Sequence, residues 1–186
     1  LWLYGGFSNT GLLNDLWKFD GNWTLVNGGN STNLPVCYEP NGWGQINYQP
    51  GGRSASSLFV KDNGELYLYG GYVSGECNTN STFSEKKDFW KFSDNKWILV
   101  KKENLPGFAI FRKYWIDSKG VFWIFDGNNF YSSDGFEWKS ADQFIVDKST
   151  PRPPNNSGFI NWFDKISGNF LVFGGGDGAT ISNEFW

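Results

Sequence analysis

The chain has 186 residues, and its 16 basic and 19 acidic side chains give a net charge of −3. This balance argues against a nucleic-acid partner, because binding to a phosphate backbone calls for a basic face. The longest apolar runs fall well short of the roughly 20 residues needed to cross a bilayer, so we expect no membrane span in this segment.

The composition favours strands and tight turns over helices. Aromatic residues make up 20 % of the chain, with 11 Trp and 18 Phe, and 24 residues are Gly. Strands prefer aromatic and β-branched side chains, whereas tight turns need Gly. No long segment repeats apolar residues at three-to-four spacing without an interrupting Gly, Pro or Asn. These observations predict an all-β fold.

Four short segments divide the chain into repeats. Each is an apolar, strand-like run that ends in Gly-Gly or Asp-Gly, and in chain order they are Leu1–Gly6, Leu66–Gly71, Phe122–Gly127 and Phe170–Gly175. A second predicted strand with an aromatic centre follows each one, at Asn14–Asp20, Lys87–Ser93, Asn128–Ser133 and Asn183–Trp186. A third, which carries a Trp, follows the first three, at Asn22–Val26, Asn95–Val100 and Phe136–Trp138. A further strand precedes the glycine element in three copies, at Ser54–Lys61, Phe108–Asp117 and Gly158–Asp164.

This order of strands and markers resembles the kelch repeat, in which each repeat forms a four-stranded blade of a β-propeller. The stretch Tyr131–Trp138 in the third repeat is in addition similar to the Asp-box turn of sialidase-type propellers. The resemblance implies one propeller segment over residues 1–186, with blades at about 1–28 (partial), 50–105, 106–144 and 151–186 (partial). It also implies that large rings such as Trp17, Trp23, Trp90 and Trp97 fill the wedges between blades. Because the first and last blades lack strands, we expect the chain to be part of a larger propeller; the alternative is a four-bladed ring.

The two cysteines, Cys37 and Cys77, lie in two long predicted loops, Asn27–Gly52 and Tyr72–Lys86. In kelch-type blades these loops emerge on one face, so the resemblance predicts a Cys37–Cys77 disulfide; the alternative is two free thiols. Four Asn-x-Ser/Thr sequences in predicted turns or loops are candidate glycosylation sites, at Asn22, Asn30, Asn80 and Asn155. Together these features favour a secreted or cell-surface protein, with a cytoplasmic protein as the alternative.

The sequence offers little for catalysis. It contains no His, which excludes Ser-His-Asp and Cys-His chemistry, and two cysteines cannot build an all-Cys zinc site. Acidic residues recur at matching repeat positions (Asp15, Asp88 and Glu184), as do Asp62, Asp117 and Asp164, and this recurrence indicates structural roles. Arg53, Arg112 and Arg152 lie near the starts of successive blades. We interpret them as structural ion-pair partners, with a carboxylate-binding arginine cluster as the alternative.

We therefore expect no enzyme, cofactor or metal site, but a binding or scaffold propeller that recognises a protein partner. Long loops on a rigid framework commonly carry binding, and the expected loops are Phe7–Leu13, Asn27–Gly52 and Tyr72–Lys86. The candidate binding surface contains Trp43, Tyr48 and Tyr72. Two alternatives stay open: a propeller that binds or acts on carbohydrate, and a structural subunit whose partners are neighbouring chains of an extracellular assembly.

Overall fold

The computed structural model describes residues 1–38, 48–80, 82–101, 113–125, 129–135, 137–140, 159–176 and 179–185. Within these ranges the chain forms strands β1 to β14 and no helix, which confirms the predicted all-β class. The chain divides into two compact units, Leu1–Leu105 and Pro106–Trp186. Among the described residues, none belongs to a helix that is long and apolar enough to span a membrane.

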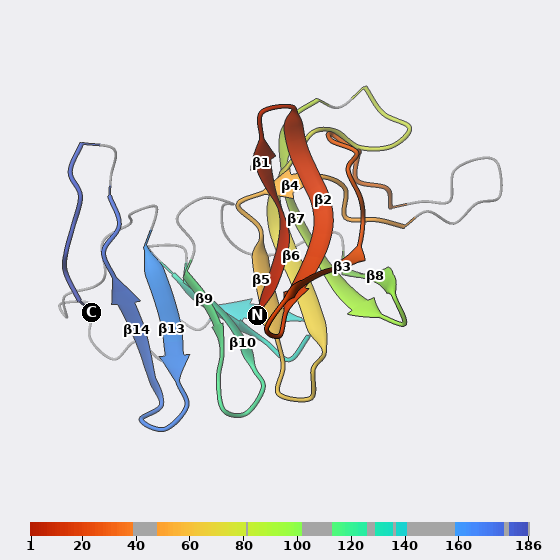
Figure 1. Ribbon diagram of the computed structural model, residues 1–186. Coiled ribbons are helices and arrows are strands. Elements are labelled where there is room, and N and C mark those ends of the chain that lie inside the picture. Colours follow the sequence, from red (N-terminus) through yellow and green to blue (C-terminus); the bar gives the residue numbers. More distant parts are fainter. Residues whose placement is uncertain are drawn as a thin grey trace. The chain divides into compact units, whose positions relative to one another are not determined.

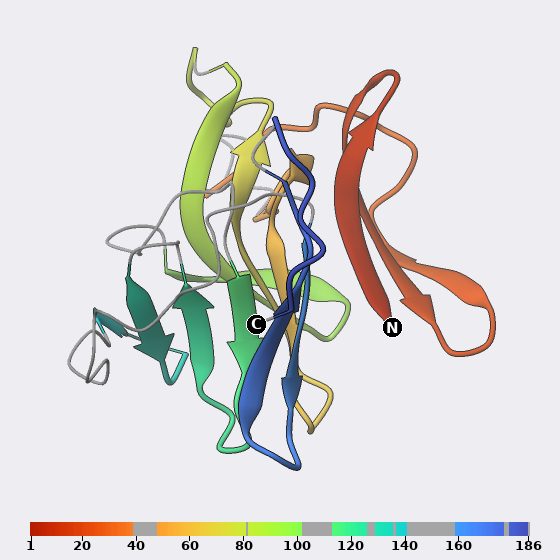
Figure 2. The same cartoon turned by 90° about the vertical axis from the view of Figure 1, so that its left-hand side faces the viewer.

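The first unit contains two antiparallel sheets of strands that follow one another along the chain. The first sheet has the order β1 (Trp2–Ser8), β2 (Gly11–Phe19), β3 (Trp23–Asn27). The second has the order β4 (Arg53–Ser54), β6 (Leu66–Val73), β7 (Ser84–Ser93), β8 (Lys96–Lys101), and β5 (Ser57–Val60) also pairs with β6. Figures 1 and 2 show that the two sheets lie side by side.

The core of this unit lies between the two sheets. The first sheet contributes Tyr4 and Leu16, and the second contributes Leu66, Leu68, Trp90 and Trp97. The edge of the Tyr4 ring meets Trp97 at a centroid distance of 5.2 Å. The prediction of buried rings between sheets is therefore confirmed for Trp90 and Trp97. It is wrong for Trp23, which is 50 % exposed on the outer face of the first sheet.

In β1 and β6 the glycine pair does not end the strand, as the sequence pattern had indicated, but produces a β-bulge within it. In the last repeat the prediction is confirmed, because β14 ends at Phe173, directly before Gly174 and Gly175. Gly5 and Gly6 have positive φ angles, and the β1–β2 register shifts between Tyr4 and Gly6. Positive φ is open to Gly because it lacks a Cβ, and the bulge lets pairing resume on its far side. The expected loop Phe7–Leu13 is therefore wrong, because β1 continues to Ser8 and β2 begins at Gly11. The same bulge in β6 shortens the loop expected at 72–86 to residues 74–83.

The second unit contains a four-stranded antiparallel sheet and a two-stranded one. The four-stranded sheet has the order β12 (Trp138–Ser140), β11 (Phe130–Ser133), β10 (Phe122–Phe125), β9 (Lys113–Ile116). Strands β13 (Ile160–Asp164) and β14 (Asn169–Phe173) form the other. The amide of Asn161 donates a 2.9 Å hydrogen bond to the Tyr114 carbonyl, and Phe170 stacks on Trp115 at 4.1 Å. These two contacts join the sheets within the unit.

Two predicted strands differ from the structure. The strand expected at 54–61 is divided into β4 and β5 because Ala55 takes a positive φ of 55°. The element expected at 183–186 forms no strand in its described part; Phe185 makes only an isolated bridge to Phe173. The turn similar to an Asp-box is a hairpin, since β11 and β12 pair on either side of it.

Candidate functional site

A buried ion pair organises the second sheet. Arg53 on β4 and Asp88 on β7 both have fully buried side chains. Their two hydrogen bonds, Nη1 to Oδ1 at 2.8 Å and Nη2 to Oδ2 at 3.1 Å, form a bidentate pair. Arg53 Nη1 also donates to the Gly70 carbonyl on the intervening strand β6, and Nε donates to the Pro50 carbonyl. The predicted structural role of Arg53 and Asp88 is therefore confirmed; Arg112 and Arg152 lie outside the described residues.

Two further side chains complete the shell around Asp88. The Tyr38 hydroxyl and the Trp90 indole N–H both donate to Oδ2, at 2.9 and 2.7 Å. Burial alone would raise the pKa of Asp88, but the Arg53 charge and these hydrogen bonds hold it below its ordinary value. Burial also raises the pKa of Tyr38, so its phenol stays protonated as a donor. The network thus fixes Tyr38 and Pro50, two positions of the segment 28–52 that connects the two sheets.

Asp15 is the counterpart of Asp88 in the first repeat. It accepts a 2.6 Å hydrogen bond from the Trp17 indole, as Asp88 does from Trp90. Its Oδ1, however, is buried and has no hydrogen-bond partner in the described part of the chain. Asp15 and Asp88 therefore both accept a hydrogen bond from the Trp two residues later. Among the described residues, only Asp88 of the two also pairs with an arginine.

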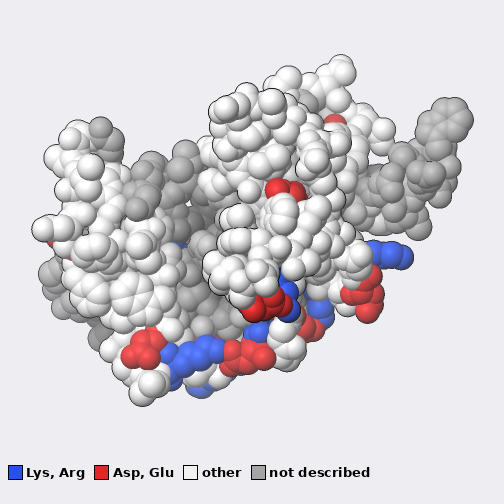
Figure 3. Space-filling model, viewed as in Figure 1, with Lys and Arg blue, Asp and Glu red and all other residues white. Residues whose placement is uncertain are grey.

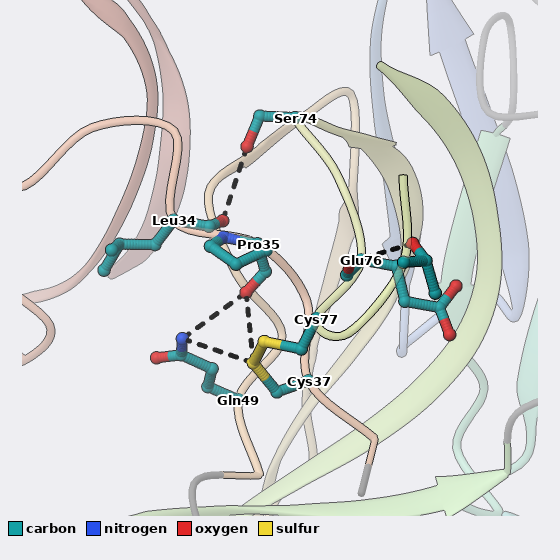
Figure 4. The surroundings of a disulfide bond; sticks show 8 residues. Leu34, Pro35, Cys37, Gln49, Ser74, Glu76 and Cys77 are labelled. Carbon is teal, nitrogen blue, oxygen red and sulfur yellow. Dashed lines mark hydrogen bonds between the residues drawn. A yellow bond between two sulfur atoms is a disulfide. The ribbon is translucent and has the colours of Figure 1, made fainter. Parts of the chain in front are cut away.

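The disulfide predicted between Cys37 and Cys77 is present and joins the inter-sheet segment to the loop between β6 and β7 (Figure 4). Its Cα atoms are 5.0 Å apart. Next to it, Val36 pairs in parallel with Glu76: the Val36 amide donates to the Gly75 carbonyl and the Cys77 amide donates to the Val36 carbonyl. The disulfide and this short ladder hold the inter-sheet segment against the loop between β6 and β7.

The same inter-sheet segment forms one wall of an open groove of about 630 Å³. Gln49 connects the two features, because its backbone pairs with Cys37 while the residue also lines the groove. The opposite wall is the β7–β8 hairpin, where Asp94 and Asn95 both have positive φ, as a two-residue type I′ turn requires. The lining residues are Asn27, Tyr48, Gln49, Ser93, Asp94, Asn95, Lys96, Trp97 and Ile98.

The groove combines groups suited to non-covalent recognition. Asn27, the last residue of β3, donates a 3.2 Å hydrogen bond to the Asn95 carbonyl in the hairpin. Tyr48 and Ile98 are 36 % and 50 % exposed, so each offers apolar surface to solvent. Its charged side chains, Asp94 and Lys96, have opposite signs. A partner with a small apolar group flanked by hydrogen-bonding groups would match this lining.

Of the predicted binding residues, the structure describes Tyr48 and Tyr72. Tyr48 lines the groove, but Tyr72 is not among the lining residues and instead stacks on Phe83 at 5.2 Å. Trp43 lies outside the described residues. The contribution of the β7–β8 hairpin was missed, although the Ser-Asp-Asn-Lys sequence at 93–96 is typical of a two-residue hairpin turn.

Three of the four candidate glycosylation sites are exposed: Asn22, Asn30 and Asn80. Asn22 lies in the turn between β2 and β3, and Asn80 lies in the loop that follows Cys77. Asn155 lies outside the described residues. In the view of Figure 3 basic and acidic side chains lie next to one another, so this face shows no extended patch of one sign.

The described residues contain no group of three or more Cys, Asp or Glu side chains placed to hold a metal ion. No model of a known protein family matches the chain, and no curated protein matches its sequence.

Proposed function

We propose that this chain is a non-catalytic binding module of kelch-type β-propeller repeats that recognises a protein partner through the groove between Tyr48 and the β7–β8 hairpin. The observation that carries the proposal is the construction of that groove. The Cys37–Cys77 disulfide and the Arg53–Asp88 network hold the inter-sheet wall in place. The other wall is the tight β7–β8 hairpin. A preorganised surface loses little conformational entropy on binding.

The sheet topology supports the propeller part of the proposal. Within each sheet, neighbouring strands are antiparallel and lie in sequence order, apart from the division of β4 and β5. Propeller blades are four-stranded antiparallel sheets repeated about a central channel. The matched registers around the glycine pairs in β1 and β6 show that the first two repeats share one backbone design.

The test is selection of peptides from a random phage-display library on the immobilised full chain. We expect enriched peptides that bind wild type and lose most of their affinity for the Tyr48→Ala and Ile98→Ser variants. Ile166→Ser is the matched control, because Ile166 is 98 % exposed and is not among the groove residues. Selected peptides that bind the Tyr48→Ala and Ile98→Ser variants as well as wild type would place recognition elsewhere.

Carbohydrate binding is the second candidate, and the groove lining is the observation that favours it. Tyr48 provides exposed aromatic surface, and Asn27 and Asn95 provide amides. Sugars present both apolar faces and hydroxyls to such sites. A glycan array probed with the full chain tests this candidate: hits that Tyr48→Ala removes would support it, and an empty array would exclude it for the glycans displayed.

We also propose that the protein is secreted or displayed at the cell surface, where disulfides persist. The Cys37–Cys77 disulfide and the exposure of Asn22, Asn30 and Asn80 support this location. Unreduced peptide mass spectrometry of the natural protein, with and without deglycosylation, is the test. A cross-linked Cys37–Cys77 peptide and glycosylated Asn30 or Asn80 are expected, whereas free thiols and bare asparagines would favour the cytoplasm.

A further inference from the structure

The two ends of strand β7 differ in charge. The strand runs from the loop at 74–83 to the β7–β8 turn, and Figure 1 shows these two connections at its opposite ends. The loop contains one charged residue, Glu76, whose carboxylate pairs with Lys86 at 2.6 Å. Most charged side chains in the view of Figure 3 lie along its lower edge. The turns at the other end of β6 and β7 carry Lys61, Asp62, Glu65, Lys91, Asp94 and Lys96.

The first half of the loop at 74–83 is held in place by the chain around it. The disulfide at Cys77 fixes the loop to the inter-sheet segment, and the Cys77 amide donates a 2.8 Å hydrogen bond to the Val36 carbonyl. The Thr79 hydroxyl donates to the Glu76 carbonyl at 2.9 Å, which closes a turn directly before Asn80. The backbone that leads into Asn80 is therefore fixed.

The end of the loop is held by a pair of stacked rings. Phe83, the residue before β7, lies parallel to Tyr72 of β6, with ring centroids 5.2 Å apart and an interplanar angle of 5°. Stacking of this kind covers one face of the Phe83 ring. The side chain is nevertheless 57 % exposed, so its other face is open to solvent.

Asn80 lies midway between these two fixed points. It is exposed, it begins the Asn-Ser-Thr sequence at 80–82, and it is three residues from both Cys77 and Phe83. Three residues of extended chain span at most about 10 Å, so the first sugar of a glycan on Asn80 reaches the open face of Phe83. Sugar rings present C–H groups on one face, and these pack against the electron-rich face of an aromatic ring.

We propose that an N-linked glycan on Asn80 folds back onto the protein and stacks its first N-acetylglucosamine on the open face of Phe83. The sugar extends the Tyr72–Phe83 stack and orders the loop between β6 and β7. N-acetylglucosamine carries no charge, which suits a loop whose one acidic residue is already paired. In the attachment step the Asn80 amide nitrogen bonds to C1 of the sugar, the C1–O bond to a lipid-linked pyrophosphate breaks, and one amide proton is released.

The glycan and the proposed binding groove lie at opposite ends of β7. The groove borders the β7–β8 turn, and the ten residues of β7 separate this turn from the loop by about 30 Å. A glycan held against Phe83 therefore leaves the groove open. The inference rests on the proposed secreted location, because N-glycosylation takes place in the secretory pathway, but it does not rest on the groove.

The test uses the full chain secreted from eukaryotic cells, with occupancy of each site measured by peptide mass spectrometry. Asn80→Gln removes the attachment site, and Phe83→Ala and Phe83→Leu remove the flat ring. Asn30→Gln is the matched control, because Asn30 is also exposed but residues 28–35 include no aromatic residue. Thermal unfolding is measured for each variant, and for wild type trimmed by an endoglycosidase that leaves only the first N-acetylglucosamine.

We expect Asn80→Gln to lower the melting temperature by a few degrees and Asn30→Gln to leave it nearly unchanged. In the Phe83→Ala and Phe83→Leu backgrounds, Asn80→Gln should cause no further decrease. Trimming wild type to the first sugar should preserve its melting temperature. In proton NMR spectra of the trimmed wild type, the ring current of Phe83 should shift the acetyl methyl resonance of the Asn80 sugar upfield.

Several results would overturn this inference. They are a bare Asn80 in the secreted chain, an equal effect of Asn80→Gln with and without the Phe83 ring, and an acetyl methyl resonance at the position of free N-acetylglucosamine. The NMR result needs no variant, so it decides the question even if the Phe83 variants do not fold. A glycosylated Asn80 without the ring contact would leave the proposed location standing, whereas a natural protein with every asparagine bare would overturn both.

Discussion

The guanidinium of Arg53 and the carboxylate of Asp88 form a bidentate pair that joins β4 to β7 across β6, with both side chains fully buried. Arg53 reaches across β6 at Gly70, whose carbonyl accepts one of its hydrogen bonds. The pair therefore connects two strands that are not neighbours in the sheet.

Breaking this pair should destabilise the first unit strongly. Asp88→Asn leaves the Arg53 charge buried without its partner, and such changes cost about 3–5 kcal/mol. Arg53→Lys keeps the charge but loses the fork geometry, so we expect it to be destabilising as well. Urea unfolding of both variants measures the loss. Lys18→Ala is the control, because the Lys18–Asp20 pair is solvent-exposed. Its effect on the free energy of unfolding should stay below about 1 kcal/mol. Equal losses of stability in Lys18→Ala and Asp88→Asn would contradict the importance of the buried pair.

Stability should fall in acid because of Asp88. Its pKa is lowered in the folded state, so the unfolded chain takes up the proton first as the pH decreases. The contribution of Asp88 is complete above the unfolded pKa of about 3.9 and is lost as pH falls through the lower, folded value. Unfolding free energies measured from neutral pH downward should decline less steeply in Asp88→Asn than in wild type. If the free energy of unfolding changed with pH equally steeply in both proteins, Asp88 would not be the group that lowers stability in acid.

The Cys37–Cys77 disulfide should contribute several kcal/mol. It closes a loop with a sequence separation of 40, for which the chain-entropy model gives roughly 4 kcal/mol. A Cys37→Ser/Cys77→Ser variant should therefore unfold at lower temperature than wild type, and reduction of wild type should reproduce the shift. Adding reductant to the double variant is the control and should change nothing.

Gly5 should be far less tolerant of alanine than its neighbour Gly6. Both have positive φ, but a Cβ at Gly5 would lie 2.6 Å from the carbonyl oxygens of Arg53 and Leu13, whereas one at Gly6 would meet nothing within 4 Å. Both variants incur backbone strain, and Gly5→Ala must in addition push the two sheets apart. Thermal unfolding should show the larger loss for Gly5→Ala; equal losses would mean that strain alone limits the glycine pair.

The sequence predicted the elements whose signal is local. The aromatic strands around Trp90 and Trp123 and the turn after Asp164 depend on nearby residues, and the repeat pattern located them. The Cys37–Cys77 prediction, by contrast, followed from the kelch resemblance and from there being one possible pair. One prediction was wrong although its signal is local. The glycine pairs at 5–6 and 70–71 were interpreted as strand ends, but they form bulges through which β1 and β6 continue. In the last repeat the strand does end before its glycine pair.

The groove could not be predicted because its walls come from distant segments. Tyr48 and Ile98 are brought together only when the inter-sheet segment packs beside the β7–β8 hairpin. The repeat pattern could not predict the exposure of Trp23 either, because Trp23 and Trp97 occupy the same register position in their repeats. Their burial differs because the first sheet packs over Trp97, whereas no described part of the first unit packs over Trp23 in the same way.

The disulfide has a consequence for a chain that has been cut. Because Cys37 and Cys77 are covalently joined, a protease that cleaves a single peptide bond between them produces two fragments that stay attached. The nicked protein would keep its intact mass on a non-reducing gel and separate into two bands only after thiol treatment. A cut between Gln49 and Cys77 would therefore leave both walls of the groove on one covalent molecule.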